Sequence, residues 1–360
     1  MKIGQESFEA LFNKLQDQRD NMRDYLTTTK SIAYHTDENG VSRMTITTGD
    51  NKVAQYGVTE LAQRQIAERL KIPYRYYDLM RVQQPTLLDQ NVNTWFDART
   101  EKRFVRTLYG DVRAFLSDRY QRIDNLEIAF KVLQILNEQV DWAQASCEVT
   151  DNHLYIKVIS NQVKEEVVPG DLVKAGFVVS NSEVGLGCVK VEPLVYRMVC
   201  SNGMIIPDQR LRKYHVGQRQ GIEDDFAIEL FREETIAKSN EAFLMKVEDI
   251  LHGALNEKLF RQTIERFRIA KQETIDVDPV ETVKTVGDNL GLNEEEKIKV
   301  SANYLSEEDY TKYGLANAIT KTANTMKDYE RATDFERLGG DVLMTDLRTL
   351  LRNVDSRKVK

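Results

Sequence analysis

The spacing of apolar residues changes near residue 220, and this change most strongly limits the fold of the chain. Between about residues 147 and 204, short apolar or alternating runs are separated by turn residues such as Asp151-Asn152, which is typical of β-strands. From residue 222 onward, apolar residues recur every three or four positions, as on one face of a helix. The pattern predicts an α+β fold, with a mainly antiparallel sheet backed by helices and an α-helical C-terminal part.

The length of 360 residues allows two or three domains. We expect three parts: an N-terminal helix and strands at 1–55, an α/β core domain at 56–220 and an α-helical C-terminal part at 221–360. The sequence contains no internal repeat and no low-complexity tract that would indicate another arrangement.

Local signals place individual elements within these parts. Thr59 is expected to cap a helix that ends near Leu70, and Thr86 is expected to cap another helix. The residues at 104–116 are largely β-branched or aromatic and flank Gly110-Asp111, which predicts a β-hairpin with its turn at this dipeptide.

Cysteine usage and hydropathy indicate where the protein works. The three cysteines, Cys147, Cys188 and Cys200, form no CxxC pair, so reduced thiols fit better than a disulfide framework. No stretch approaches the roughly 18 consecutive apolar residues of a membrane span, and no secretory signal opens the chain. We expect a protein of the bacterial host cytoplasm that has no membrane partner.

Common motifs of catalysis are missing from the sequence. It contains no GxxxxGK[ST] phosphate loop, no HExxH and no GxSxG, and its four histidines are far apart and near no cysteine pair. We therefore expect no cofactor and name no metal ligand or catalytic residue. A carboxylate site assembled from separate strands would leave no sequence signal, so enzymatic activity stays open, with a non-enzymatic role favoured.

Charge is distributed unevenly along the chain. The formal net charge of −7 argues against coating of nucleic acid by bulk charge. Residues 99–122 nevertheless hold seven Lys/Arg against three Asp/Glu, a balance of +4, and residues 190–219 hold six against two, again +4. Residues 221–300 hold eleven against nineteen, a balance of −8. Ordinary surface variation explains these zones as well as a nucleic-acid groove does.

The first basic zone ends where a predicted strand gives way to a predicted helix. Arg119, Tyr120 and Arg122 combine two guanidinium groups with an aromatic ring, which are the groups that hold phosphate and stack on a base. In the alternative interpretation, Asp118 and Asp124 pair with these arginines at the strand-to-helix turn.

The second basic zone contains a predicted buried strand and a basic stretch. Arg197 lies in that strand, where a guanidinium needs a partner or a groove, and Cys200 is expected to point into the core. Ser201-Asn202-Gly203 predicts a tight turn. The next stretch is basic with an interleaved tyrosine, which suits phosphate contacts as well as a solvated loop; its candidate contacts are Arg210, Arg212, Lys213 and Tyr214.

Several of these stretches resemble the phage- and plasmid-like proteins grouped as domain of unknown function 932. The resemblance rests on residues 72–77 (Ile-Pro-Tyr-Arg-Tyr-Tyr), 116–125 (Leu-Ser-Asp-Arg-Tyr-Gln-Arg-Ile-Asp-Asn), 196–203 (Tyr-Arg-Met-Val-Cys-Ser-Asn-Gly) and 313–320 (Tyr-Gly-Leu-Ala-Asn-Ala-Ile-Thr), followed by Gly339-Gly340. The sequence departs from the family at 181–185 (Asn-Ser-Glu-Val-Gly), where relatives carry a histidine-containing segment. The resemblance implies a mobile-element origin, but it implies no agreed activity.

Three hypotheses about function follow. The first is a nucleic-acid-binding protein of phage or plasmid DNA metabolism, which would bind or anneal single strands as a homo-oligomer. The alternative is a non-enzymatic interaction or assembly protein that acts on a host or phage protein through the long apolar stripe after residue 220. The third, a metal-dependent enzyme, has no positive support in the sequence.

Overall fold

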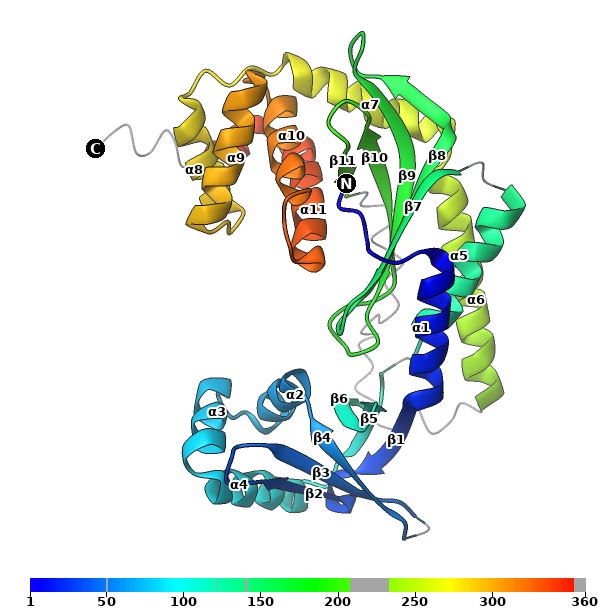
Figure 1. Cartoon of the computed structure of the whole chain (residues 1–360), viewed down its shortest axis with the longest axis vertical. Coiled ribbons are helices and arrows are strands. Elements are labelled where there is room, and N and C mark those ends of the chain that lie inside the picture. The colour runs from blue at the N-terminus through cyan, green and yellow to red at the C-terminus, as the bar shows by residue number, and fades with distance from the viewer. Residues whose placement is uncertain (50, 121, 140–141, 208–232, 353–360) are drawn as a thin grey trace.

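The computed structural model describes residues 1–49, 51–120, 122–139, 142–207 and 233–352, which form two lobes (Figure 1). The chain begins in the large lobe, builds the small lobe with residues 22–117, and then returns to the large lobe. Both lobes contain sheets backed by helices, and the C-terminal part is helical. The predicted α+β class is therefore confirmed.

The small lobe is built on a six-stranded sheet with the order β1-β5-β6-β4-β3-β2. Its pairs are antiparallel except for the short parallel pair β4–β6. A single 3-10 turn, Thr29–Ser31, follows the first strand. The strands are β1 (Met22–Thr28), β2 (Ile32–Thr36), β3 (Ser42–Thr47), β4 (Val53–Val58), β5 (Lys102–Leu108) and β6 (Asp111–Ser117).

Three helices pack on one face of this sheet, namely α2 (Glu60–Leu70), α3 (Tyr74–Gln83) and α4 (Pro85–Ala98). Met44 and Val105 of the sheet and Ile66 and Phe96 of the helices are fully or almost fully buried and belong to one apolar core. On the other face, β6 meets the large lobe, where Leu116 packs with Val184, whereas β2 and β3 alternate buried residues with exposed or half-buried ones. This alternation fixes the register, because a one-residue slip would expose the apolar set.

The predicted starts of two small-lobe helices have different outcomes. Thr59 caps α2 as predicted, because its hydroxyl oxygen accepts a hydrogen bond from the amide of Ala62, and the helix ends at Leu70. The predicted cap at Thr86 is wrong, since α4 already begins at Pro85. Proline suits the first helical position because its φ is fixed near the helical value and its missing N–H would have no helical partner there.

The hairpin predicted at 104–116 is confirmed, with its turn one residue earlier than expected. Tyr109 and Gly110 occupy the turn with φ of 50° and 90°, and Asp111 is already the first residue of β6. Two successive residues with positive φ form the kind of two-residue turn that matches the twist of the paired strands.

The large lobe is built on a five-stranded antiparallel sheet with the order β11-β10-β9-β8-β7, which helices cover on both faces (Figure 1). The strands are β7 (Trp142–Val149), β8 (Leu154–Glu166), β9 (Leu172–Asn181), β10 (Lys190–Arg197) and β11 (Asn202–Ile205). The helices are α1 (Phe8–Asn21), α5 (Asn125–Gln139), α6 (Glu233–Ala254), α7 (Glu257–Gln272), α8 (Pro279–Asn289), α9 (Glu294–Glu307), α10 (Lys312–Ala323), α11 (Tyr329–Met344) and α12 (Leu347–Leu350).

Strand β8 shows how the sheet is buried on both faces. Ile156 and Val158 belong to the core formed with α1, α5 and α6, whereas Tyr155 contacts Tyr329 of α11 on the opposite face. The continuous apolar run in the sequence reflects this double cover. None of the helices in the described part of the chain is long and apolar enough to cross a membrane.

The turn predicted at Ser201-Asn202-Gly203 lies earlier in the chain. Ser201 has a φ of 53°, but Asn202 and Gly203 already belong to β11, where they pair with Arg197 and Tyr196 of β10. Asn202 is held in the strand because its side-chain amide donates to Thr320 Oγ1 at 2.6 Å, a long-range contact that local turn signals do not reveal.

Candidate functional site between the lobes

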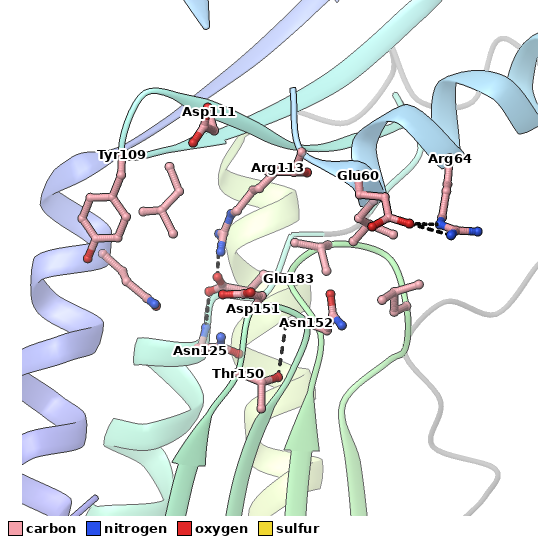
Figure 2. Close-up of a pocket in the computed structure, with 16 residues that line it drawn as sticks. Glu60, Arg64, Tyr109, Asp111, Arg113, Asn125, Thr150, Asp151, Asn152 and Glu183 are labelled. Carbon is pink, nitrogen blue, oxygen red and sulfur yellow. Dashed lines mark hydrogen bonds and ion pairs between the residues drawn. The ribbon is translucent and has the colours of Figure 1, made fainter. Parts of the chain in front are cut away.

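A cleft of about 760 Å³ lies between the two lobes, and most of the residues that line it are polar or charged (Figure 2). Clefts of this size between lobes are common places for ligands. The small lobe contributes Thr59, Glu60, Arg64, Tyr109, Asp111 and Arg113. The large lobe contributes Gln18, Asn125, Thr150, Asp151, Asn152 and Glu183, and a few apolar residues complete the lining.

Arg113 lies at the cleft because strand β6 has a β-bulge. Arg106 pairs with Ala114 and Thr107 pairs with Val112, so Arg113 is the extra residue between these two pairs. Bulges often redirect a side chain next to a functional site. Here the Arg113 side chain extends from the small lobe to the large lobe, where its Nη2 lies 2.6 Å from Glu183 Oε2 (Figure 2).

Glu183 connects this arginine to the beginning of α5. Its carboxylate is almost fully buried, and its Oε1 accepts a hydrogen bond of 2.6 Å from the backbone amide of Asn125. A carboxylate is favourable at this place because the first amides of a helix have no helical acceptor and the helix dipole is positive there. Glu183 thus links Arg113 of the small lobe to the first residue of α5 in the large lobe.

Behind the cleft, a second arginine joins three separate segments. Arg106 of β5 is fully buried, with its Nε 3.0 Å from Asp24 Oδ1 of β1 and its Nη2 2.7 Å from Asp124 Oδ1 before α5. Its Nη1 donates to the carbonyl oxygen of Glu183 at 3.2 Å. We call Asp24, Arg106, Arg113, Arg122, Asp124 and Glu183 the junction network, because their ion pairs span the two lobes.

The charges of the junction network stabilise one another. Burial alone would raise the pKa of Asp124, but the neighbouring guanidinium groups of Arg106 and Arg122 lower it below the ordinary value of 3.8. Burial alone would likewise lower the pKa of Arg106, whereas Asp24 and Asp124 raise it. Arg106 and Asp124 are therefore both charged at neutral pH, and each of them has an oppositely charged partner.

Asp111 and Asp151 are two exposed carboxylates of the cleft, one on each lobe. Neither makes an ion pair or a hydrogen bond with the described part of the chain. Strand β4 makes room for one of them, since a Cβ at Gly57 would lie only 2.0 Å from Asp111 Oδ1. Glycine at this position lets the carboxylate lie over the neighbouring strand.

The charge of the cleft therefore comes from two residues. Its lining holds four carboxylates and two arginines, but Glu183 pairs with Arg113 and Glu60 pairs with Arg64 at 2.6 Å. The two remaining carboxylates, Asp111 and Asp151, leave their oxygens open to hydrogen-bond donors and positive charge of a ligand. Within the residues that the structure covers, no group of three or more His, Cys, Asp or Glu side chains is arranged to hold a metal ion.

The predicted residues Arg119, Tyr120 and Arg122 lie where the chain passes from the small lobe to the large lobe. Arg119 is exposed. The Tyr120 ring stacks on Phe104 and its hydroxyl donates to the Ser182 carbonyl oxygen at 2.8 Å, so one ring face is used inside the protein. Burial raises the pKa of Tyr120 to about 12.

Arg122 has one partner that the alternative interpretation proposed, Asp124, and a second one, Asp24, that it did not propose. Its Nη2 lies 2.8 Å from Asp124 Oδ2, and its Nη1 lies 3.2 Å from Asp24 Oδ2, although 48% of the side chain remains exposed. The structure thus brings Arg122 into the junction network. Its predicted role in nucleic-acid binding stays a prediction.

Arg197 does not line the cleft and has its own partners. Its Nε is 2.7 Å from Asp171 Oδ1, and its guanidinium lies over the Tyr313 ring. The prediction that Cys200 points into an apolar core is wrong, because its sulfur lies 3.6 Å from Arg197 Nη1 and 3.7 Å from Glu307 Oε1 in a half-buried polar cluster. The other predicted contacts lie outside the described residues: Arg210, Arg212, Lys213 and Tyr214.

Sequence reasoning missed the residues that line the cleft. Arg113 and Glu183 are 70 positions apart, so no local pattern connects them. One signal was present, since Glu183 lies within the stretch 181–185 that departs from the pattern of the resembled family. Residues 181–184 of this stretch are buried, and they include the Glu183 carboxylate that pairs with Arg113.

Comparisons with known proteins identify a family but no activity. No curated protein and no solved structure matches the chain significantly. The profile of one family, described as Domain of unknown function (DUF932), matches residues 113–354, which is more than half of the 360 residues. The matched part runs from the Arg113 bulge through the large-lobe sheet to the C-terminal helices. The chain therefore belongs to the DUF932 family.

Proposed function

We propose that this protein binds single-stranded nucleic acid, with one base of the strand inside the cleft and the phosphates outside it. The observation that carries the proposal is the composition of the cleft, which combines hydrogen-bonding side chains from both lobes with an exposed aromatic ring. We also propose the mobile-element origin that the resemblance implies, since DNA metabolism is a common task of phage and plasmid proteins.

The lining of the cleft suits an unpaired base better than a phosphate group. Gln18 and Asn152 line the cleft with amide groups, which carry both donors and acceptors, and the ring of Tyr109 is 56% exposed. Proteins recognise unpaired bases through hydrogen bonds to their edges and through stacking on aromatic rings. A base inside a duplex does not present these groups, because its edge is paired and its faces are stacked.

Electrostatics favour phosphates outside the cleft. Asp111 and Asp151 add negative charge to its walls and repel a phosphate, whereas a neutral base meets no such barrier. Candidate phosphate contacts near the cleft are Arg64, with 54% of its side chain exposed, and Arg119. The basic stretch predicted from the sequence at 210–219 remains a further candidate.

Direct binding measurements test this proposal. The purified protein is titrated into a labelled single strand of about 40 nucleotides, and in parallel into the matching duplex, across a salt series. We expect binding to the single strand that weakens as salt rises, and weaker binding to the duplex. Absence of single-strand binding even at low salt would contradict the proposal.

Two arginines at the lobe connection provide a matched pair of variants. Arg119→Ala should weaken binding and reduce the salt slope by about 0.7 for each lost phosphate contact. Arg122→Ala should have a smaller effect on the slope, because Asp24 and Asp124 already neutralise this guanidinium. Unchanged affinity and slope in both variants would remove them from the proposed binding surface.

The alternative function, interaction with a host or phage protein, has one specific observation in its favour. Helix α3 exposes apolar side chains at helical spacing, with Tyr76 52%, Leu79 47% and Val82 59% exposed. Exposed apolar patches are typical of interaction surfaces. Light scattering after chromatography tests the homo-oligomeric form of this alternative, which a strictly monomeric protein would contradict.

A further inference from the structure

We propose that the cleft selects guanine among the bases. This inference rests on the proposed binding of single strands, which it makes specific for one base. It follows from two neighbouring side chains of β6, Asp111 and Arg113, which line the same cleft (Figure 2).

Asp111 provides two acceptors side by side. Its carboxylate is exposed at the cleft and makes no hydrogen bond with the described residues, and Gly57 leaves space for it on the neighbouring strand. An ionised carboxylate accepts hydrogen bonds at both oxygens and donates none. A ligand that places two adjacent N–H groups opposite Asp111 would therefore donate a hydrogen bond to each carboxylate oxygen.

Arg113 provides unused donor capacity two residues further along the strand. Its Nη2 contacts Glu183 and, at 3.0 Å, the sulfur of Met22, whereas its Nη1 makes no hydrogen bond with the described residues. A ligand at this wall of the cleft can therefore accept a hydrogen bond from Arg113. The β-bulge turns the arginine side chain toward the cleft that Asp111 also lines.

Guanine is the base whose pairing edge matches this order of groups. Its edge presents one acceptor, O6, followed by two donors, N1–H and N2–H. Arg113 can donate to the acceptor while Asp111 accepts from the two donors. Cytosine and adenine each present a single donor group on that edge, and thymine presents one donor between two acceptors, which would face the carboxylate unfavourably.

A base-substitution experiment tests the inference on the unmodified protein. Four labelled strands are compared, all oligo-dT with one central position changed to dG, inosine or dA, or left as dT. Inosine keeps O6 and N1–H but lacks the N2 amino group. We expect the dG strand to bind about tenfold more tightly than the others, the usual size of one bidentate base contact.

One variant and one control test whether Asp111 causes the preference for dG. Asp111→Asn replaces one acceptor oxygen with a donor and should remove the preference for dG, so that this variant binds the dG strand and oligo-dT with similar affinity. Asp97→Asn is the matched control, because Asp97 is exposed on α4 and does not line the cleft. Equal binding of all four strands would overturn the guanine inference but leave the proposed single-strand binding in place.

A second set of ligands distinguishes a base within a strand from a free nucleotide. Guanosine monophosphate and inosine monophosphate are titrated calorimetrically into the protein. If no strand binds but the guanosine nucleotide binds more tightly than the inosine nucleotide, the proposed function fails and the guanine site stands with a free nucleotide as its ligand. If neither the dG strand nor the guanosine nucleotide is preferred, the inference is overturned.

Discussion

Two groups of buried charges in this molecule use the same chemistry for different purposes. The core pair, Lys157 and Glu336, has both side chains fully buried, with Nζ 2.6 Å from Oε2. The junction network also contains a fully buried cation, Arg106, but it continues through Arg122 to the surface and through Glu183 to the cleft. Burial of charge is therefore not by itself a sign of a functional site.

The difference lies in what each group of charges connects. The core pair fastens α11 to the face of β8 within a single lobe. The junction network joins β1, β5 and β6 of the small lobe to the start of α5 and the segment after β9 in the large lobe. We infer that the core pair affects stability alone, whereas the junction network affects both stability and the geometry of the cleft.

The largest expected effect comes from breaking the core pair. Glu336→Leu leaves the Lys157 ammonium without its partner in a site closed to water, and we expect a loss of about 3–5 kcal/mol in the free energy of unfolding, measured with urea. The double variant Lys157→Met/Glu336→Leu should regain much of this loss, because no unpaired charge remains. As a control, Glu295→Gln changes an exposed helix pair and should leave the urea midpoint unchanged.

Breaking the junction network should cost somewhat less stability but should also affect binding. Arg106→Met removes the partner of Asp24, Asp124 and the Glu183 carbonyl oxygen, and we expect a loss of about 3 kcal/mol. This loss lies at the lower end of the range of about 3–5 kcal/mol expected for a broken buried ion pair, because Arg122 still pairs with both aspartates. Single-strand affinity should fall in the folded variant. Unchanged affinity would show that the network, like the core pair, serves stability alone.

A smaller, pH-dependent effect should come from Asp124. Its pKa is lowered in the folded protein, so its stabilising contribution is fully present above the ordinary pKa of 3.8 and is lost as pH falls through the lowered value. Asp124→Asn should cost about 2 kcal/mol near neutral pH and flatten the acid limb of the stability profile. Urea unfolding at several pH values between 3 and 7 measures this. An unchanged acid limb would mean that Asp124 is not ionised in the network.

Sequence reasoning succeeded where the determinants are local. The Thr59 cap, the helix end at Leu70 and the hairpin around Gly110 depend on residues within a few positions of each other, and the structure contains all three. Continuous apolar runs also predicted the buried strands of the large lobe. The two errors in predicted local structure, at Thr86 and at Ser201-Asn202-Gly203, are small shifts in the boundary of a helix and of a strand.

The cleft could not be predicted in the same way, because long-range contacts create it. Arg106 meets Asp24 across 82 positions and Arg113 meets Glu183 across 70 positions. The bulge that turns Arg113 toward the cleft depends on pairing with β5, which the sequence of β6 alone does not specify. Arg197 illustrates the same limit, since the need for a partner was evident but its partner Asp171 was not.

Mapping where a single strand touches the protein tests whether the cleft receives a base. A strand with a photoreactive base at its central position is crosslinked to the protein, and the modified residues are identified by mass spectrometry. We expect crosslinks to residues that line the cleft, above all Tyr109 and the segment 183–186. Crosslinks confined to the α3 surface, or to the Arg197 region, would contradict the claim that the cleft receives the base.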